Sequence, residues 1–229
     1  MKISCILTSF NRPKYVRQAL RSVEMQTHKD YELFVMDESN IFDIHKTVAA
    51  FKFPSVVVKH YDIDKVTRSH QGRMSIKIND ALRLATGDLI CYLCDDDYYF
   101  PNWFHDANEF FEDAPQVTVA FGVLLQKETD NVDLSNSGGY RRFFNHAITE
   151  PAGKLNHNQV IHRRLDPPLL WPEERTYISA PDAYYFAALA NAHVFVPLET
   201  MAAVRREHSL SLQKTLQAHV DAQVEGARE

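Results

Sequence analysis

The amino-acid sequence predicts an α/β protein in which a mostly parallel central sheet is flanked by helices. Through the first half of the chain, apolar segments with the length of strands alternate with segments of helical periodicity. The expected strands are 2–8, 31–36, 56–61 and 89–94. A strand that is followed by a helix and a further strand needs a crossover connection, and such connections make neighbouring strands parallel. The alternation is therefore typical of a layered α/β fold.

Helices are expected between and after these strands. The first would begin after Asn11, which can cap a helix, with Pro13 in its first turn. Its apolar stripe consists of Val16, Ala19, Leu20 and Val23. Further helices are expected at 73–86, 102–112 and 181–192, and later strands at 117–125 and 193–198. The rest of the second half is irregular, and 213–229 is a polar tail.

Composition limits the classes of function. The chain has 229 residues, of which 45% are hydrophobic and 24% charged, as in ordinary globular proteins. A net charge of −5 and the lack of a basic stripe argue against a general nucleic-acid binder. No apolar run has the length of an integral membrane segment, the N-terminus resembles a strand rather than a signal peptide, and three cysteines do not suggest a disulfide framework. We therefore expect a cytoplasmic protein built as a single domain.

Cys91 and Cys94 form an isolated Cys-x-x-Cys pair. Without a second pair or a well-spaced histidine, this pair is a weak zinc signal. Core thiols on a buried strand are the favoured interpretation. The sequence leaves both interpretations open.

The most informative segment is a strand that ends in three aspartates. Leu89–Cys94 is mostly apolar and runs directly into Asp95, Asp96 and Asp97. Burying three adjacent carboxylates is costly, because each loses hydration and repels the others. The arrangement is expected where a divalent cation such as Mg²⁺ or Mn²⁺ and a hydroxyl-rich ligand lie at the end of the strand. A solvated, aspartate-rich turn is the alternative.

Polar residues also follow other strands of the expected sheet. Thr8 and Ser9 end the first strand, and Asp37 and Glu38 end the second. Ligands of open parallel sheets bind outside the carboxyl ends of the strands. We therefore expect these polar residues to meet the aspartate triplet in one crevice.

Four segments share features of a known family: Ile6–Arg12, Ser22–Thr27, Glu32–Ser39 and Gly87–Pro101, the last being a strand with an acidic motif and a following proline. These segments resemble family 2 inverting glycosyltransferases of the GT-A fold. The pattern is most similar to the transferases of spore-coat polysaccharide synthesis, and it continues more loosely through 156–163, 181–186 and 197–199. The resemblance implies a single GT-A domain over 1–229, with a nucleotide-sugar-binding half at 1–101 and an acceptor half at 102–212.

The resemblance also implies residues that bind the donor nucleoside. Thr8 and Ser9 would hold the base and the ribose. Glu38 stands where the family usually has an aspartate that accepts a hydrogen bond from uracil or thymine N3. Arg68 would pack on or bond to the base, with Arg73 nearby, unless Arg68 is a solvated loop residue.

The triplet would then bind the ribose and the diphosphate. The resemblance assigns Asp95 to the ribose and Asp96 to a metal ion bridging the diphosphate. Asp97 would act through the sugar or a metal-bound water, or would instead cap the helix near Pro101. Cys94 replaces another aspartate of the common pattern, as it does in the spore-coat type.

Basic residues near the end of the chain extend this expectation. His208 would be a second metal ligand and Arg206 a phosphate partner. A surface turn rich in histidine and arginine is the alternative for both residues.

Asp182 is the candidate general base on the acceptor side. It matches the family position and follows Pro181 at an expected helix start, where an acid is also favoured by the helix dipole alone. His157 and Arg163 would line the acceptor side, or His157 would be a buried structural histidine. Four aromatic residues could stack on a sugar or belong to the core: Trp103, Trp171, Tyr184 and Tyr185.

Taken together, these features imply a metal-dependent, inverting transfer of a sugar from a UDP- or dTDP-sugar to a hydroxyl group, with a saccharide as one candidate acceptor. Mn²⁺ or Mg²⁺ is the expected cofactor. One alternative is a nucleotide-sugar-binding protein of the same fold without activity. Another is a nucleotidyltransferase, but such enzymes usually have a glycine-rich loop after the first strand, and Thr8–Lys14 contains no glycine.

Overall fold

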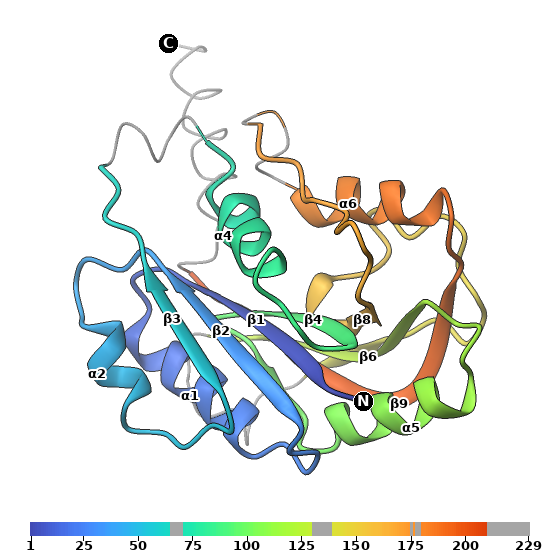
Figure 1. Ribbon diagram of the computed structural model, residues 1–229, viewed down its shortest axis with the longest axis horizontal. Helices are drawn as coiled ribbons and strands as arrows, with labels where there is room; N and C mark the ends of the chain where they lie inside the picture. The colour runs from blue at the N-terminus through green and yellow to red at the C-terminus, as the bar shows by residue number, and fades with distance from the viewer. Residues whose placement is uncertain (65–70, 130–138, 175, 177–179, 210–229) are drawn as a thin grey trace.

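The computed structural model describes residues 1–64, 71–129, 139–174, 176 and 180–209. In chain order the elements are β1 (Ile3–Ser9), α1 (Pro13–Glu24), β2 (Tyr31–Asp37), α2 (Ile44–Val48), β3 (Val56–His60), α4 (Arg73–Leu82), β4 (Leu89–Cys94), β5 (Tyr98–Tyr99), α5 (Trp103–Asp113), β6 (Val119–Glu128), β7 (Tyr140–Arg142), the short 3₁₀ helix η1 (His157–Gln159), β8 (Val160–Arg163), α6 (Pro181–Ala190) and β9 (Phe195–Glu207). They form three layers, with a central sheet, α1, α2 and α5 on one face, and α4 and α6 on the other (Figure 1).

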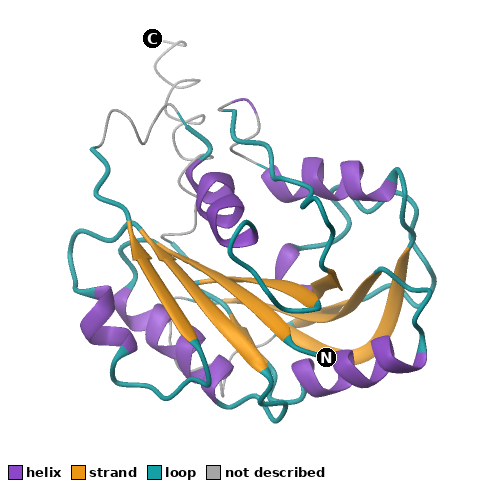
Figure 2. Cartoon of the chain, in the orientation of Figure 1, coloured by secondary structure: helices purple, strands orange, loops and turns teal. Residues whose placement is uncertain are grey.

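One sheet connects the two halves of the chain. Its strand order within the described residues is β3-β2-β1-β4-β8-β6-β9-β5, and β7 pairs with β6. The neighbours β3, β2, β1 and β4 are parallel, as is the pair β6 and β9. β8 runs antiparallel to both β4 and β6 and joins the halves. The predicted α/β fold with a mostly parallel sheet is confirmed, and Figure 2 shows the sheet continuing between the helical layers.

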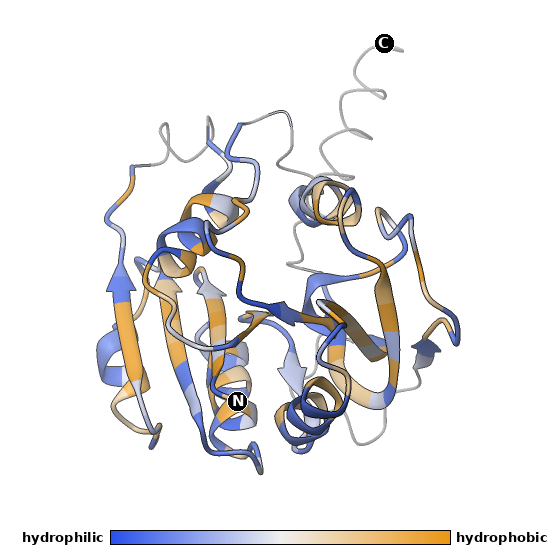
Figure 3. Ribbon diagram, turned by 45° about the vertical axis from the view of Figure 1, so that its right-hand side comes forward, coloured by the Kyte–Doolittle hydropathy of each residue, from blue (hydrophilic) through white to orange (hydrophobic). Residues whose placement is uncertain are grey.

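The inner strands of the parallel half, β1, β2 and β4, are buried on both faces, whereas the edge strand β3 is mostly exposed. Every residue of β1 and β2 is buried, which explains their continuous apolar sequences. Hydrophobic residues concentrate on these central strands (Figure 3). Cys91 pairs in register with Cys5 of β1, and both are fully buried. Cys91 is therefore a core thiol.

Each face of the sheet has its own apolar core. On one face, α1 and α5 contribute Val16, Leu20 and Trp103. On the other face, α4 and α6 contribute Ile78 and Phe186. The sheet is thus held from both sides, and its carboxyl edge has a defined position.

The ends of two elements differ from the predictions for local reasons. Asn11 does not cap α1; it has a positive φ of 53°, and its side chain exchanges hydrogen bonds with Asn40. The helix predicted to end at 86 ends at Leu82, and the Thr86 amide donates to Glu32 Oε1 at 2.7 Å. In both places the chain leaves the helical path to bind a neighbouring strand or turn.

The last strand is much longer than the predicted 193–198. β9 extends from Phe195 to Glu207. It pairs with β6 on one side and with β5 on the other. Two register shifts interrupt its pairing with β6 around Val123. Pairing across the sheet therefore forms a strand where the local sequence, which includes Glu199 and Thr200, has little apolar alternation.

Candidate active site

The polar ends of three strands meet at the carboxyl edge of the sheet. Thr8 of β1 is in register with Cys94 of β4, and its carbonyl accepts the Asp95 amide at 3.1 Å. The Ser9 carbonyl accepts the Glu38 amide at 3.1 Å. These bonds place the residues predicted from three separate strand ends in one polar cluster.

Each aspartate of the triplet is buried and has its own partners. Asp95 accepts from the Phe10 amide at 2.8 Å. Asp96 Oδ2 lies 3.0 Å from His208 Nε2. Asp97 accepts from Asn158 Nδ2 at 2.5 Å and from the Arg206 amide at 2.6 Å. The triplet is therefore not a solvated turn, and Asp97 does not cap α5, whose N-cap is Asn102.

Arg12 has a role that the sequence interpretation did not assign. Its Nη1 lies 2.8 Å from Asp95 Oδ1 and 3.2 Å from Asp96 Oδ2. These carboxylates raise the pKa of Arg12 against the opposing effect of burial. Arg12 lies within the family-like segment Ile6–Arg12, but nothing in the sequence around this single arginine predicts that it contacts the aspartates.

The three carboxyl groups differ in their tendency to ionise. Burial raises the pKa of Asp95, against the effect of Arg12. Burial also opposes ionisation of Asp96, but hydrogen bonding to His208 and the charge of Arg12 lower its pKa. Burial and the charge of Asp96 together raise the pKa of Asp97 well above its usual value. Asp96 is thus the carboxylate whose negative charge the site stabilises most.

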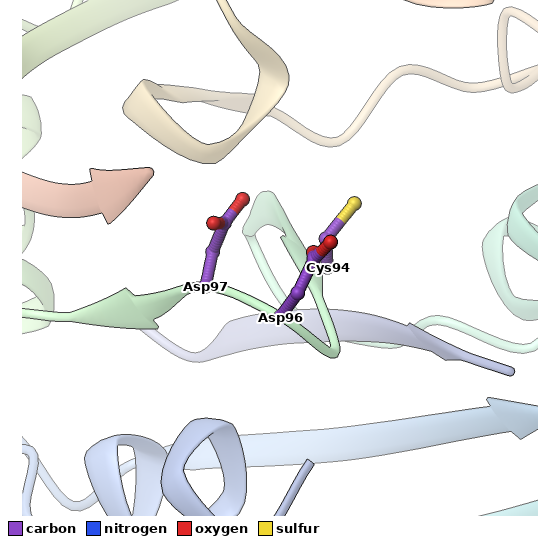
Figure 4. Close-up of side chains that lie close together, drawn as sticks. All are labelled: Cys94, Asp96 and Asp97. Carbon is purple, nitrogen blue, oxygen red and sulfur yellow. The ribbon is translucent and has the colours of Figure 1, made fainter. Parts of the chain in front are cut away.

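The donor atoms of this cluster fit a hard divalent cation. One ligand atom from each of Cys94, Asp96 and Asp97 lies within 4.8 Å of the others, and the three side chains project to the same side of the turn (Figure 4). Carboxylate oxygens suit Mg²⁺ and Mn²⁺, whereas burial and the neighbouring carboxylates raise the pKa of the Cys94 thiol. The 3.0 Å between Asp96 Oδ2 and His208 Nε2 also matches the roughly 3 Å between adjacent ligands of an octahedral ion. Asp96 and Asp97, with His208 beside Asp96, could supply ligands to such an ion.

The predicted base-binding residues form a buried ion pair. Arg73 Nε donates to Glu38 Oε1 at 2.6 Å, and the Glu38 side chain is fully buried. The guanidinium lies 5.6 Å from the centre of the Tyr61 ring. Glu38 is thus already engaged by Arg73. Arg68 lies outside the described residues.

The floor of the site contains a buried lysine and an unsatisfied hydroxyl. Lys77 Nζ donates to the Ser9 carbonyl at 3.0 Å. Ser9 Oγ is buried and has no hydrogen-bond partner among the described residues. Thr8 is also buried.

Arg206 and His208 are buried beside the triplet and do not belong to a surface turn. The Arg206 guanidinium donates to the Asp96 carbonyl, and to Gln18 Oε1 at 2.6 Å. It lies 4.4 Å from the centre of the Tyr15 ring, which the His208 ring also contacts. The strand β9 carries Arg206 and leads into His208, so its length is what brings both residues to the site.

Asp182 lies in the first turn of α6, across from the end of β4. Its Oδ2 is 3.4 Å from His157 Nδ1, and its Oδ1 accepts the Ala183 amide at 3.0 Å. Burial would raise the pKa of Asp182, but the hydrogen bond and charge of His157 lower it. His157 Nε2 in turn lies 3.1 Å from Cys94 Sγ.

The other residues expected on the acceptor side have structural contacts. Arg163 donates to the carbonyls of Val117 and Phe111. Trp103, Trp171 and Tyr185 are core residues, whereas Tyr184 is 50% exposed. Asn158, which the sequence interpretation passed over, links Asp97 to the Cys94 amide. Its position in a predicted irregular segment gave no signal of this role.

Comparison with known proteins identifies the family. Residues 4–167 match the family model described as Glycosyl transferase family 2. The chain belongs to glycosyltransferase family 2. Among the described residues, no helix is long and apolar enough to cross a bilayer.

The relatives of this family 2 chain include proteins of several bacteria. It is 28% identical to Protein CgeD of Bacillus subtilis over 205 residues, which is 86% of this chain and 48% of that protein. It is 23% identical to the GalNAc(5)-diNAcBac-PP-undecaprenol β-1,3-glucosyltransferase of Campylobacter jejuni, covering 68% of this chain and 41% of that one. The chain thus spans about half the length of the curated relatives it matches.

Solved structures share the fold of this family 2 chain. TarS of S. aureus in complex with UDP superposes with a TM-score of 0.69 at 20% identity, over 91% of this chain and 61% of that one. The mannosyltransferase PcManGT of Pyrobaculum calidifontis, in complex with GDP-Man and Mn²⁺, has a TM-score of 0.61 at 14% identity, over 89% of this chain and 56% of that one. These similarities agree with the predicted GT-A architecture.

Proposed function

We propose that this chain transfers a sugar, with inversion, from a UDP- or dTDP-sugar to a hydroxyl group of an acceptor, with Mn²⁺ or Mg²⁺ as cofactor. The observation that supports it best is the buried triplet Asp95–Asp97, which gathers two cationic side chains, Arg12 and Arg206, and His208 at the carboxyl edge of the sheet. Such a site suits the diphosphate and cation of a nucleotide sugar. The TarS structures with UDP and with UDP-GlcNAc support a uridine donor by analogy.

In this proposal residues 1–101 bind the donor and 102–212 bind the acceptor. Asp96, Asp97 and His208 hold the cation, which when bound neutralises the departing diphosphate. Asp95 orients the ribose, and Thr8, Ser9, Glu38, Arg68 and Arg73 form the nucleoside side. Because Arg73 already engages Glu38, the base would contact an ion pair rather than a lone carboxylate.

Asp182 is the proposed general base. Its lowered pKa keeps the carboxylate ionised near neutral pH, so that it can accept the proton of the attacking hydroxyl. A single displacement by a hydroxyl held against Asp182 would invert the anomeric centre. We also propose that the protein is cytoplasmic and that its acceptor is a saccharide, in keeping with the resemblance to spore-coat polysaccharide transferases.

A nucleotide-sugar-binding protein without activity is the second candidate. Cys94 in place of an aspartate and the engagement of Glu38 by Arg73 are the observations that favour it. Slow, metal-dependent hydrolysis of a UDP-sugar separates the two, because a transferase can use water as a poor acceptor and a binding protein cannot.

The proposal is tested by calorimetric titration of UDP and dTDP, each with Mn²⁺ and with EDTA. We expect metal-dependent binding to the wild type and loss of at least ~10-fold in affinity in Asp96→Asn, because the best-stabilised carboxylate of the cation site becomes neutral. Asp113→Asn, at the exposed end of α5, is the matched control and should bind like the wild type. Equal Mn²⁺-dependent affinity in Asp96→Asn and the wild type would contradict the proposal.

A further inference from the structure

A chain of three side chains links the donor strand to the proposed base. Cys94 ends β4, His157 begins η1 and Asp182 lies in the first turn of α6. His157 contacts both of the others, with Nε2 3.1 Å from Cys94 Sγ and Nδ1 3.4 Å from Asp182 Oδ2. Neither His157 nor Cys94 is a cation ligand or the base in the proposed reaction.

The ring of His157 is held in place by its backbone and by packing. η1 has a capping box in which Asn156 Oδ1 accepts the Asn158 amide at 3.0 Å and Gln159 Oε1 accepts the Asn156 amide at 3.2 Å. The imidazole also packs at 84° against the Trp171 ring, with 6.0 Å between the ring centres. The orientation of the ring therefore does not depend on Asp182.

Exposure separates the roles of His157 and Asp182. Both ring nitrogens of His157 are engaged, and its side chain is only 9% exposed. The Asp182 side chain is 21% exposed and can reach an incoming hydroxyl. His157 is thus suited to orienting the carboxylate and is not itself placed to accept the proton.

The identity of residue 94 selects which ring nitrogen carries the proton. A thiol is a hydrogen-bond donor, so Cys94 can donate to Nε2 and leave the proton of a neutral ring on Nδ1, facing Asp182. A carboxylate at position 94 can only accept, so it would compete with Asp182 for the proton of a neutral ring or bring a second proton onto Nε2. This gives a physical reason for the cysteine at a position where the family pattern has an aspartate.

We propose that His157 is a positioning residue that, with Cys94 behind it, donates from Nδ1 to Asp182 Oδ2 and fixes the carboxylate toward the acceptor. The inference rests on the proposed function, in which Asp182 is the base. A carboxylate in a first helical turn can otherwise rotate toward free backbone amides, and Oδ1 already accepts the Ala183 amide. Displacing a catalytic group by about 1 Å can cost on the order of 10²-fold in rate.

The first test needs no activity. Long-range ¹H–¹⁵N NMR of the histidine rings of the full chain at pH 8, assigned with His157→Gln, reports which nitrogen of His157 is protonated. We expect the proton on Nδ1 alone in the wild type, and a protonated Nε2, with or without a proton on Nδ1, in Cys94→Asp. A wild-type ring with a bare Nδ1 would overturn the inference, whatever reaction the protein catalyses.

The second test compares two amides at position 157. The Asn side chain can place its amide where Nδ1 lies and keep the bond to Asp182, whereas the Gln side chain reaches the position of Nε2 and loses that bond. In Mn²⁺-dependent UDP-sugar hydrolysis, we expect kcat to fall about 10- to 100-fold in His157→Gln but less than about 3-fold in His157→Asn, with the donor KM unchanged in both. Equal kcat in the two variants would overturn a positioning role.

Two further variants separate this inference from the proposed function. His105→Gln, an exposed histidine on α5, is the control and should behave as the wild type. If Asp182→Asn keeps full turnover, the proposed base is wrong. If Asp182→Asn loses turnover and His157→Gln does not, only the positioning role is wrong. If Asp182 is the base and His157 positions it, His157→Gln should lower turnover little further in an Asp182→Asn background.

Discussion

At the aspartate triplet, a single arginine contacts two carboxylates that would otherwise repel each other. Arg12 Nη1 lies 2.8 Å from Asp95 and 3.2 Å from Asp96, and its side chain is only 19% exposed. Arg12 thus supplies part of the positive charge that the cluster needs when no cation is bound. A bound divalent ion would supply the same kind of stabilisation to Asp96.

We therefore predict that Arg12→Gln makes folding more dependent on Mn²⁺. Without metal, the variant should lose roughly 1–3 kcal/mol of stability, because the buried carboxylates lose a charged partner. Mn²⁺ should then raise the Tm of Arg12→Gln by more than that of the wild type, which thermal unfolding with and without the ion measures.

Arg17→Gln, an exposed change on the same helix, is the control for this experiment. It should leave both Tm values near those of the wild type. An equal Mn²⁺ shift in Arg12→Gln and the wild type would speak against the shared role of the arginine and the ion.

At the scale of elements, α5 lies unusually close to the sheet at Gly122 of β6. A Cβ at this position would lie 2.7 Å from Trp103 Cζ3 and 2.8 Å from the Ala202 Cβ of β9. These contacts are shorter than packed carbon atoms allow, so the close approach of helix, β6 and β9 requires glycine. The register shifts between β6 and β9 occur in the same region.

Gly122→Ala should accordingly destabilise the fold by roughly 1–3 kcal/mol through overpacking. Chemical denaturation measures the loss. Trp103→Phe removes the atom nearest to the new methyl group, so the double variant should lose less stability than the sum of the single changes. Strict additivity would show that the indole is not the obstacle.

At the scale of the whole molecule, two buried ionisable groups join segments that are distant in sequence. Glu32 of β2 accepts from Lys2 Nζ and Ser4 Oγ, each at 2.6 Å, and from the Thr86 amide at 2.7 Å. His162 of β8 has Nε2 2.8 Å from the hydroxyl of Tyr92 on β4. The first network connects β1, β2 and the segment that leads into β4, and the second connects β4 to β8.

These networks predict two steps of acid destabilisation. Burial lowers the pKa of His162 to about 4 in the folded protein, whereas the pKa of an unfolded histidine is about 6.5. Between these two pH values the unfolded chain therefore binds more protons than the folded one. Stability should therefore fall as the pH is lowered through this window, by on the order of 3 kcal/mol. Burial opposes ionisation of Glu32, but its hydrogen bonds lower its pKa to about 2, which adds a second loss from roughly pH 4.3 down to 2.

Urea denaturation across this pH range measures both steps. His162→Gln should be less stable overall, but its stability should change less between pH 6.5 and 4, while the step below pH 4 is kept. If the variant shows the same slope as the wild type in the upper window, His162 is not the group responsible.

Much of the parallel half could be predicted because its signals are local. β1, β2 and β4 are continuous apolar segments that end in polar residues, and this pattern encodes both the strand and its burial on two faces. The meeting of Thr8, Glu38 and the triplet then follows from a general property of parallel sheets. The expectation that Asp182 and His208 serve the site came from the family resemblance; His208 contacts Asp96, Asp182 contacts His157, and their roles stay predictions.

The amino-acid sequence by itself thus determined the layered architecture, its carboxyl edge and the acidic character of that edge. The tertiary structure alone decided the partners: Asn158 and the Arg206 amide on Asp97, Arg12 between Asp95 and Asp96, and His157 between Cys94 and Asp182. It also decided the length of β9, which carries Arg206 to the triplet. The physical reason is that periodicity and composition report whether a side chain is buried, whereas the atom it contacts depends on how segments far apart in the sequence pack together, such as Gln18 and Arg206, 188 positions apart.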